Sequence, residues 1–353
     1  TTIDDPSAYF HTQLYTGNGS GNNPRAITND ANSDIRPDWI WIKERSSTSS
    51  SRLVDSSRGG TKGLTSDTAA GEDTANFITF GASDGFTLTD YNGGTNQDSQ
   101  TYVAWQWVAN GGTTTTNDAS STGVGTIDSV YQANTTAGFS ILTYTGTGSA
   151  GTIAHGLGST PQVIITKDRG AVENWIMHHH TLGATFIMRM DDTTAKVDAA
   201  SYNDTLPAST VFSVDDGGNN QSGNTYVSYC FAEKQGYSKF GSFVGNGNAD
   251  GPFVYLGFKP AWILYKRAGD GTNNWGLIDN KRDTHNPCTN TYAVNLSNVV
   301  GDSSGNGAGD FLSNGWKIGV TAGSRNASGV TYIYMAFAEH PFVSSKGVPT
   351  TAR

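Results

Sequence analysis

The chain is poor in cysteine and in positive charge. It has 2 Cys among 353 residues, and 22 Lys and Arg against 31 Asp and Glu, which gives a net charge of −9. Two thiols cannot form a disulfide framework, so we expect Cys230 and Cys288 to be free. Nucleic-acid binding depends on basic contacts to phosphate, and neither the net charge nor a local Lys/Arg cluster supplies them. No apolar run approaches the ~20 residues of a transmembrane helix, so we expect no membrane insertion.

Two common catalytic signatures are also missing. The sequence has no His-Glu-x-x-His and no phosphate-binding Gly-x-x-x-x-Gly-Lys-Ser/Thr. A glycosidase needs two opposed carboxylates at a defined separation, and the scattered Asp and Glu residues nominate no such pair. We therefore expect a protein that is not an enzyme and has no cofactor, with a Ca²⁺ site left open.

Glycine and aromatic residues are abundant. Gly accounts for 44 residues, and Phe, Trp and Tyr make up 11% of the chain. Gly and Asn tolerate the positive φ of tight turns, while the aromatic content supplies apolar surface that a disordered chain lacks. The composition predicts many short strands joined by turns around a real core.

One stretch of alternating apolar and polar residues occurs three times, at 100–107, 224–233 and 330–339, each time with a Thr-Tyr pair near its start. Each copy is preceded by a strand that ends in Lys and follows a Pro, at 37–43, 161–167 and 260–266. The Thr follows the Pro by 64 residues in the first two copies (37 to 101 and 161 to 225) and by 71 in the third (260 to 331). This spacing indicates an internal repeat of roughly one hundred residues.

Short strands at roughly 8–12-residue intervals are typical of antiparallel sandwiches. The fold predicted is all-β, with three tandem antiparallel β-sandwich domains of jelly-roll or concanavalin-like type. We assign residues 1–110 to the first domain, 137–236 to the second and 237–353 to the third. The polar stretch 111–136 is predicted to be a flexible linker, which makes the first domain mobile and leaves the other two as a rigid pair.

Positions that align across the copies separate structural residues from candidate sites. Trp39 and Trp262 align with Val163, a core filler, so both are expected in the core. Lys43, Lys167 and Lys266 end the same strand, where a solvated lysine protects a sheet margin; ligand contact is the alternative.

Two tryptophans are candidates for ligand binding. Trp175 and Trp275 follow Asn174 and Asn274 at the end of polar loops, where an exposed indole ring could stack on a sugar. Half-buried packing is the alternative interpretation.

Metal ligands are the other candidates. In a strand, His178 and His180 of the run 178–180 share a face and could meet one metal ion, although a solvated strand end explains the run equally simply. The acidic pairs Asp191-Asp192 and Asp215-Asp216 could contribute to a Ca²⁺ site, with turn formation as the alternative.

Several segments carry a resemblance to a known family: 37–43 (Pro-Asp-Trp-Ile-Trp-Ile-Lys), 55–59 (Asp-Ser-Ser-Arg-Gly), 101–105 (Thr-Tyr-Val-Ala-Trp), 237–247 and the tail 347–349. They resemble a repeat found in virion proteins of marine tailed phages, described as tail-fibre, appendage or capsid-surface components. The resemblance covers nearly the whole chain and implies a concanavalin-like sandwich and a virion role. It implies no enzyme and transfers no site residue.

The sequence thus favours a structural protein on the virion surface (a tail fibre, appendage or capsid decoration) that contacts other virion proteins, forms a homo-oligomer and binds host-surface glycans as a secondary role. One alternative is a self-assembling surface or filament protein. The other is a secreted carbohydrate-binding module or glycan-active enzyme.

Overall fold

The computed structural model describes the chain except for residues 20, 22, 82, 90–93, 303–307 and 352–353. The protein is all-β and its sheets are antiparallel, as the sequence predicted. Helical segments in the described part are short: η1 (Pro6–Ala8), α1 (Ala119–Thr122), η2 (His180–Leu182), η3 (Ala200–Tyr202) and α2 (Gly323–Asn326). No described helix is long and apolar enough to cross a membrane.

Three large sheets form the framework. The first has the order β1 (Phe10–Thr16), β9 (Thr101–Trp107), β3 (Trp39–Glu44) and β4 (Arg52–Asp55). The second has the order β10 (Thr115–Asn117), β11 (Ser129–Asn134), β12 (Phe139–Thr145), β19 (Thr225–Phe231), β14 (Val163–Asp168), β15 (Ile176–His179), β16 (Phe186–Arg189) and β17 (Val197–Asp198). The third has the order β20 (Ser238–Val244), β28 (Thr331–Pro341), β22 (Phe258–Arg267), β23 (Gly276–Asp279), β24 (Asn290–Ala293) and β25 (Gly301–Asp302).

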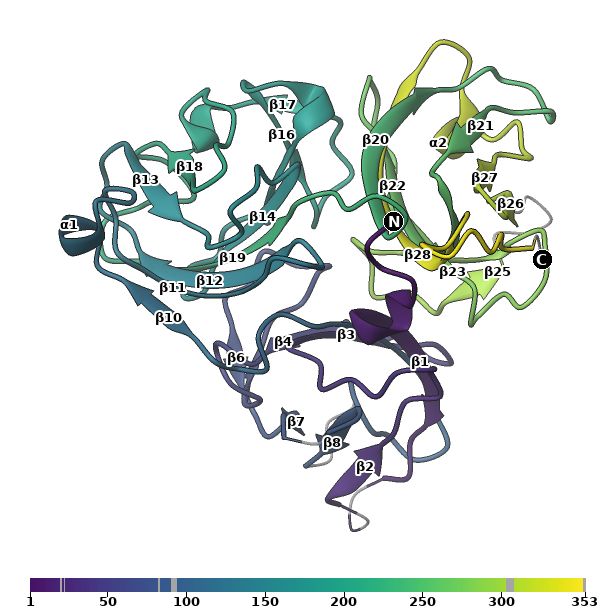
Figure 1. Cartoon of the computed structure of the whole chain (residues 1–353), viewed down its shortest axis with the longest axis horizontal. Helices are drawn as coiled ribbons and strands as arrows, with labels where there is room; N and C mark the ends of the chain where they lie inside the picture. The colour runs from purple at the N-terminus through teal and green to yellow at the C-terminus, as the bar shows by residue number, and fades with distance from the viewer. Residues whose placement is uncertain (20, 22, 82, 90–93, 303–307, 352–353) are drawn as a thin grey trace.

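Each large sheet is faced by a small one. These small sheets have the orders β2 (Arg25–Ile27), β8 (Phe86–Leu88), β7 (Ile78–Thr79); β13 (Gly151–Ala154), β18 (Val211–Val214); and β21 (Phe253–Tyr255), β27 (Gly315–Lys317), β26 (Asp310–Leu312). A separate pair joins β5 (Lys62–Gly63) to β6 (Asp73–Thr74). We call the segments that contain β1–β9, β10–β19 and β20–β28 the first, second and third repeat. Figure 1 shows them as three lobes with their large sheets turned towards a common centre.

The strand register aligns the repeats residue by residue. Trp39 lies opposite Trp107, Val163 opposite Phe231 and Trp262 opposite Phe337. The predicted equivalence of Trp39, Val163 and Trp262 is therefore confirmed, and the two tryptophans are buried core residues.

The central strand of each large sheet is buried on both faces. In β3, Ile40 and Ile42 pack inside their own sandwich, while Trp39 and Trp41 point the other way. The same alternation holds in β14 and β22. A sheet covered on both faces needs apolar residues at successive positions, and this explains the Trp-Ile-Trp-Ile run.

The outward faces of the three large sheets meet in one shared core. Its rings come from every repeat: Trp39 stacks on Tyr229 with centroids 4.4 Å apart, Trp107 meets Trp262 at 5.6 Å, and Phe231 meets Phe337 at 5.9 Å. Aromatic pairs at these separations stabilise beyond their buried area. The repeats are consequently held as one body.

The predicted flexible linker is corrected by the structure. Residues 111–136 contain β10 and β11, which extend the second large sheet, and α1, whose N-cap Asp118 accepts a hydrogen bond from the Ser121 amide. Gln132 also donates to Ser56 and Ser57 of the first repeat, at 2.8 and 2.7 Å. Thr and Ser fit a pleated strand once a neighbouring strand pairs with them, and composition alone could not reveal that neighbour. The expected mobility of the first repeat is contradicted by the shared core.

The Tyr of each Thr-Tyr pair anchors a turn. The Tyr102, Tyr226 and Tyr332 hydroxyls accept the amides of Gln97, Gln221 and Ala327 at 2.8–2.9 Å. Beside each lies a fully buried Asn, at 96, 220 or 326, that accepts an amide from the Gly-x-Gly turn of the first strand. The repeated stretch is thus a structural anchor. Cys230 and Cys288 are both buried and form no disulfide with each other, as predicted.

Candidate functional site

Three equivalent lysines tie the repeats together. Lys43 donates to the Ser297 carbonyl of the third repeat at 3.0 Å, Lys167 to the Ala69 carbonyl of the first at 3.0 Å, and Lys266 to the Thr193 carbonyl of the second at 2.9 Å. All three residues are fully buried, which corrects the expected solvated sheet margin. Burial lowers the pKa of each ammonium group to about 8.

A second set of equivalent contacts follows the same closed ring. The Asp55 carboxylate, paired with Arg58, accepts the Tyr229 hydroxyl of the second repeat at 2.7 Å. In the third repeat Asp279, paired with Arg282, accepts the Trp105 indole N–H at 3.0 Å. The second repeat has His179 at this register position, and its Nε2 lies 3.1 Å from the Tyr334 carbonyl of the third. Each pair of repeats is therefore joined by a lysine and by one of these contacts.

The Asp-Arg pairs are residues that the sequence-based search for sites missed. Burial alone would lower the pKa of Arg58, but the adjacent Asp55 carboxylate raises it above its ordinary value, so the guanidinium stays charged. The signal that could have revealed the pairs is their shared Asp-x-x-Arg spacing, at 55–58 and 279–282, directly after equivalent strands.

The predicted exposed tryptophans are buried, which corrects the stacking hypothesis. Trp175 is 0% exposed and donates its indole N–H to the Thr65 carbonyl of the first repeat at 2.8 Å. Trp275 is 2% exposed and donates to the Arg189 carbonyl of the second repeat at 2.8 Å. Neither ring has a free face for a sugar, and both join repeats.

The neighbouring asparagines support this packing. Asn174 donates to the Asp191 carboxylate at 3.1 Å, and Asn274 accepts from Asn295 at 2.9 Å. The same two partners, Asp191 and Asn295, accept the backbone amides of Trp175 and Trp275. Asn274 itself remains exposed at the edge of a surface hollow. The two asparagines thus mark equivalent turns.

The candidate metal ligands lie apart. No three His, Cys, Asp or Glu side chains of the described chain are placed to share a metal ion. Both carboxylate oxygens of Asp191 already accept hydrogen bonds, and Asp192 accepts the Thr194 amide at 2.7 Å.

The other candidates also have partners within the protein. His180 contacts the Phe240 carbonyl at 2.8 Å, and the backbone of Asp215 bonds to Ser201 and Asn220. Asp216 follows Asp215 in the same turn. The acidic pairs are therefore turn residues.

His178 is the exception in this group. It is fully buried, its ring meets Tyr202 edge-on at 5.6 Å, and neither ring nitrogen has a hydrogen-bond partner among the described residues. Burial lowers its pKa to about 4, so the folded chain holds the neutral form.

We expect His178→Phe to raise the free energy of unfolding by about 1–3 kcal/mol at pH 7, because it removes a desolvated polar ring from an apolar site. The gain should grow towards pH 5. The unfolded His binds a proton below about 6.5 and the folded one only below about 4, so the wild type loses stability as the pH falls through this window. Urea unfolding at both pH values measures the effect, with the exposed His285→Phe as the control. A wild type stabilised by added Zn²⁺, and a destabilised His178→Phe, would instead make His178 a metal ligand.

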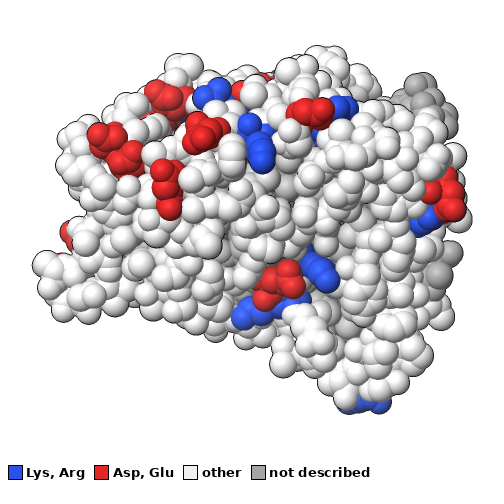
Figure 2. Space-filling view, turned by 90° about the horizontal axis from the view of Figure 1, so that it is seen from above, with Lys and Arg blue, Asp and Glu red and all other residues white. Residues whose placement is uncertain are grey.

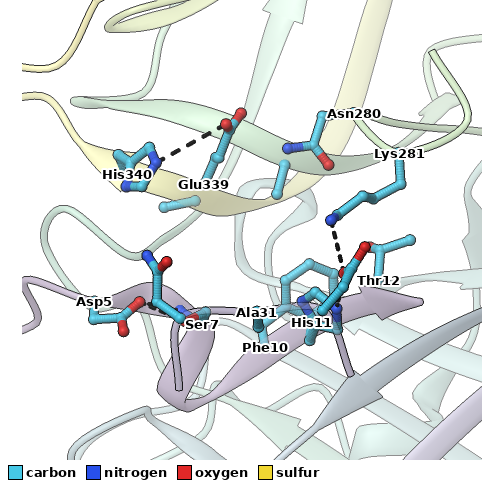
Figure 3. Close-up of a pocket in the computed structure, with 14 residues that line it drawn as sticks. Asp5, Ser7, Phe10, His11, Thr12, Ala31, Asn280, Lys281, Glu339 and His340 are labelled. Atoms are coloured by element: carbon cyan, nitrogen blue, oxygen red, sulfur yellow. Dashed lines mark hydrogen bonds and ion pairs between the residues drawn. The ribbon is translucent and has the colours of Figure 1, made fainter. Parts of the chain in front are cut away.

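A 170 Å³ pocket lies between the first and third repeats (Figure 3). The Asp30 carboxylate accepts from Lys281 at 2.8 Å and lies 2.9 Å from His11 Nε2. Burial and the nearby Lys281 charge lower the pKa of His11. Burial alone would raise the pKa of Asp30, but the hydrogen bond from Lys281 lowers it below its ordinary value.

Glu339 and His340 of β28 line the other wall, and Figure 3 shows them facing the segment that carries Asp5, Ser7 and His11. Thr12 Oγ1 and Glu339 Oε2 are buried atoms with no hydrogen-bond partner in the described part of the chain. The pocket can therefore accept hydrogen bonds from a small polar molecule or from water. The sequence-based search missed these residues because they meet only when the first and third repeats pack.

Charge on the surface is sparse. The face in Figure 2 is mainly uncharged, acidic residues are most frequent at its upper left, and most basic residues lie beside acidic ones. No basic stripe crosses this face.

The match to a family model runs through all three lobes. It covers residues 5–341 and is described as a domain of unknown function, DUF7483. The chain belongs to this family. No curated protein and no solved structure matches the chain. The DUF7483 match thus includes both residues of each lysine contact and of each Asp55 and Asp279 contact between repeats.

Proposed function

We propose that this DUF7483 chain is a structural protein of a phage virion surface, of the tail-fibre, appendage or capsid-decoration kind. The observation that carries the proposal is where the phage-like segments lie. Lys43, Asp55, Arg58 and Trp105 all belong to segments that resemble virion proteins of marine tailed phages, and all four hold the repeats together. The resemblance to phage virion proteins therefore includes residues that hold the three repeats together.

The physical properties support the same role. An extracellular particle needs components that stay folded without disulfides, and here a shared aromatic core connects three sandwiches, two of which also contain a buried ion pair. The lysines and tryptophans first considered for ligand contact bond instead to backbone carbonyls of a neighbouring repeat. We propose a scaffold that contacts other virion proteins, forms a homo-oligomer and presents its loops to host glycans. We assign it no reaction and no cofactor.

Labelling of particles tests this proposal. Antibodies raised against the purified chain should decorate virions of the phage that encodes it in immunogold electron microscopy, and the chain should copurify with those particles. Absence of the chain from purified virions would overturn the proposal. Filaments formed by the purified protein alone would instead favour a self-assembling surface protein.

A further inference from the structure

Two aromatic rings break the pattern of burial in this chain. All eight tryptophans are buried. Among the described Phe, Trp and Tyr residues, only Phe253 and Tyr255 are exposed, with 45% and 55% of their surface accessible to solvent. They are two residues apart on β21, so their side chains share one face of the strand. Between them Val254 points inwards and lies opposite Trp316.

The backbone around both rings leaves room for them. A Cβ atom at Gly315, on the neighbouring strand β27, would lie 2.8 Å from the Phe253 ring, so only Gly allows the ring to occupy this place. The Tyr255 ring lies alongside Gly257, and Lys239 Nζ is 5.5 Å from its centroid, within cation–π range. The two rings thus form a supported surface, which we call the aromatic platform.

The other two repeats show that the framework does not need these rings. Ile27 and Ile153 lie opposite Phe86 and Phe212, as Val254 lies opposite Trp316. Beside Ile27 are the exposed Ala26 and Thr28, and beside Ile153 are Thr152 and Ala154. Only the third repeat has aromatic residues at these flanking positions. A stabilising role in the sandwich therefore does not explain them.

A groove of 310 Å³ begins at the platform. Tyr255 lines it together with Glu233, Gln235 and Lys239 from the segment that enters the third repeat, and with Phe342 and Val343 from the end of β28 onwards. It combines an aromatic wall with hydrogen-bond donors and acceptors. Such a combination suits a ligand with an apolar face and a polar rim.

Area and charge decide which occupant fits. Two rings that are half exposed offer roughly 200 Å² of aromatic surface, whereas a stable protein interface needs about 800 Å² from each partner. The charged groups beside the rings occur in opposite signs: Lys317, opposite Phe253, is paired with Asp250, and the groove holds one Glu and one Lys. This balance selects neither an anion nor a cation.

We propose that the aromatic platform and its groove bind a neutral glycan, with sugar rings stacked on Tyr255 and Phe253 and hydroxyl groups bonded to Glu233, Gln235 and Lys239. This deepens the proposed function, because it places the host-glycan contact of the virion protein at one site in the third repeat. Glycan binding by the purified chain is measured without virions, so it can fail independently of the virion role.

Affinity electrophoresis of the purified full chain tests the site with laminarin, galactomannan and dextran as neutral probes and alginate as the anionic one. We expect at least one neutral polysaccharide to retard the wild type. The dissociation constant should rise about fivefold in Phe253→Ala or Tyr255→Ala and about twentyfold in the double variant, while Tyr255→Phe, which keeps the ring, retains binding. Val172→Ala, which alters an exposed side chain in the second repeat, is the matched control.

Unchanged urea midpoints for these exposed variants show that they remain folded. The proposal is overturned if no neutral polysaccharide retards the wild type, if alginate alone does, or if the double variant binds as well as the wild type. A dimer in light scattering that Tyr255→Ala dissolves would assign the platform to a second copy of the chain instead.

Discussion

Replacing Asp55 by Ala should lower the free energy of unfolding by about 3–5 kcal/mol, because it leaves the Arg58 guanidinium buried without its carboxylate. Both side chains are fully buried, and the same carboxylate also accepts the Tyr229 hydroxyl from the second repeat. Loss of Asp55 therefore removes an ion pair and a contact between repeats together. Urea unfolding at pH 7 measures the cost.

Asp73→Ala is the matched control, because Asp73 pairs with Arg52 in the same repeat at 3.0 Å but has a side chain that is 52% exposed. Its removal should cost less than about 1 kcal/mol. Asp279→Ala, at the equivalent place in the third repeat, should resemble Asp55→Ala, since Arg282 is equally buried. Equal costs for Asp55→Ala and Asp73→Ala would contradict the importance of the buried pair.

The repeat and the burial of its central strand were predictable from the sequence. Three Pro-to-Thr spacings and an aligned Trp, Val and Trp placed residues 39, 163 and 262 in one equivalent position, and the strand register confirms it. Comparing the three copies with one another succeeded because aligned residues occupy the same backbone environment in each repeat.

The closure of the three repeats around one core was not predicted. The Trp-Ile-Trp-Ile run of β3 contained the signal, because apolar residues at successive positions indicate a strand covered on both faces. The sandwich of the first repeat covers only one face of β3, and the shared core between the repeats covers the other face. Polar composition in 111–136 then favoured a linker, although the partner strand β12 lies just beyond it.

Trp175 and Trp275 show why the candidate site was misplaced. Each follows Asn in a polar loop, which is the pattern of an exposed residue. Their hydrogen-bond acceptors are the carbonyls of Thr65 and Arg189, 110 and 86 residues away in the sequence. A backbone carbonyl in another repeat leaves no trace in the identity of its residue, so side-chain patterns could not reveal it.

The free energy of unfolding should rise as the pH increases from about 8 to about 10. In the folded chain Lys43, Lys167 and Lys266 lose their protons near pH 8, because burial lowers the pKa of each from 10.5. In the unfolded chain they stay protonated until about 10.5, so the unfolded state binds more protons in this window and raising the pH favours folding. Each lysine contributes up to about 1.4 kcal/mol per pH unit.

The rise should end near pH 10, where tyrosines act in the opposite direction. Burial raises the pKa of Tyr226 to about 12 and that of Tyr229 well above its ordinary value, so the unfolded chain loses phenol protons first and the free energy of unfolding falls as the pH rises further. A maximum near pH 10 distinguishes this chain from proteins that are most stable between ~5 and 8.

Lys167→Met isolates one lysine of the ring. This substitution should lower the slope of the free energy of unfolding against pH, between pH 8 and 10, by about one third. It removes one of three groups that release a proton on folding. It also leaves the Ala69 carbonyl without its donor, which costs about 1–3 kcal/mol at pH 10. Lys62→Met, at a partly exposed lysine that donates to Thr74, is the control and should leave the slope unchanged. A wild-type stability that is flat or falling from pH 8 to 10 would mean that the three lysines remain protonated between the repeats.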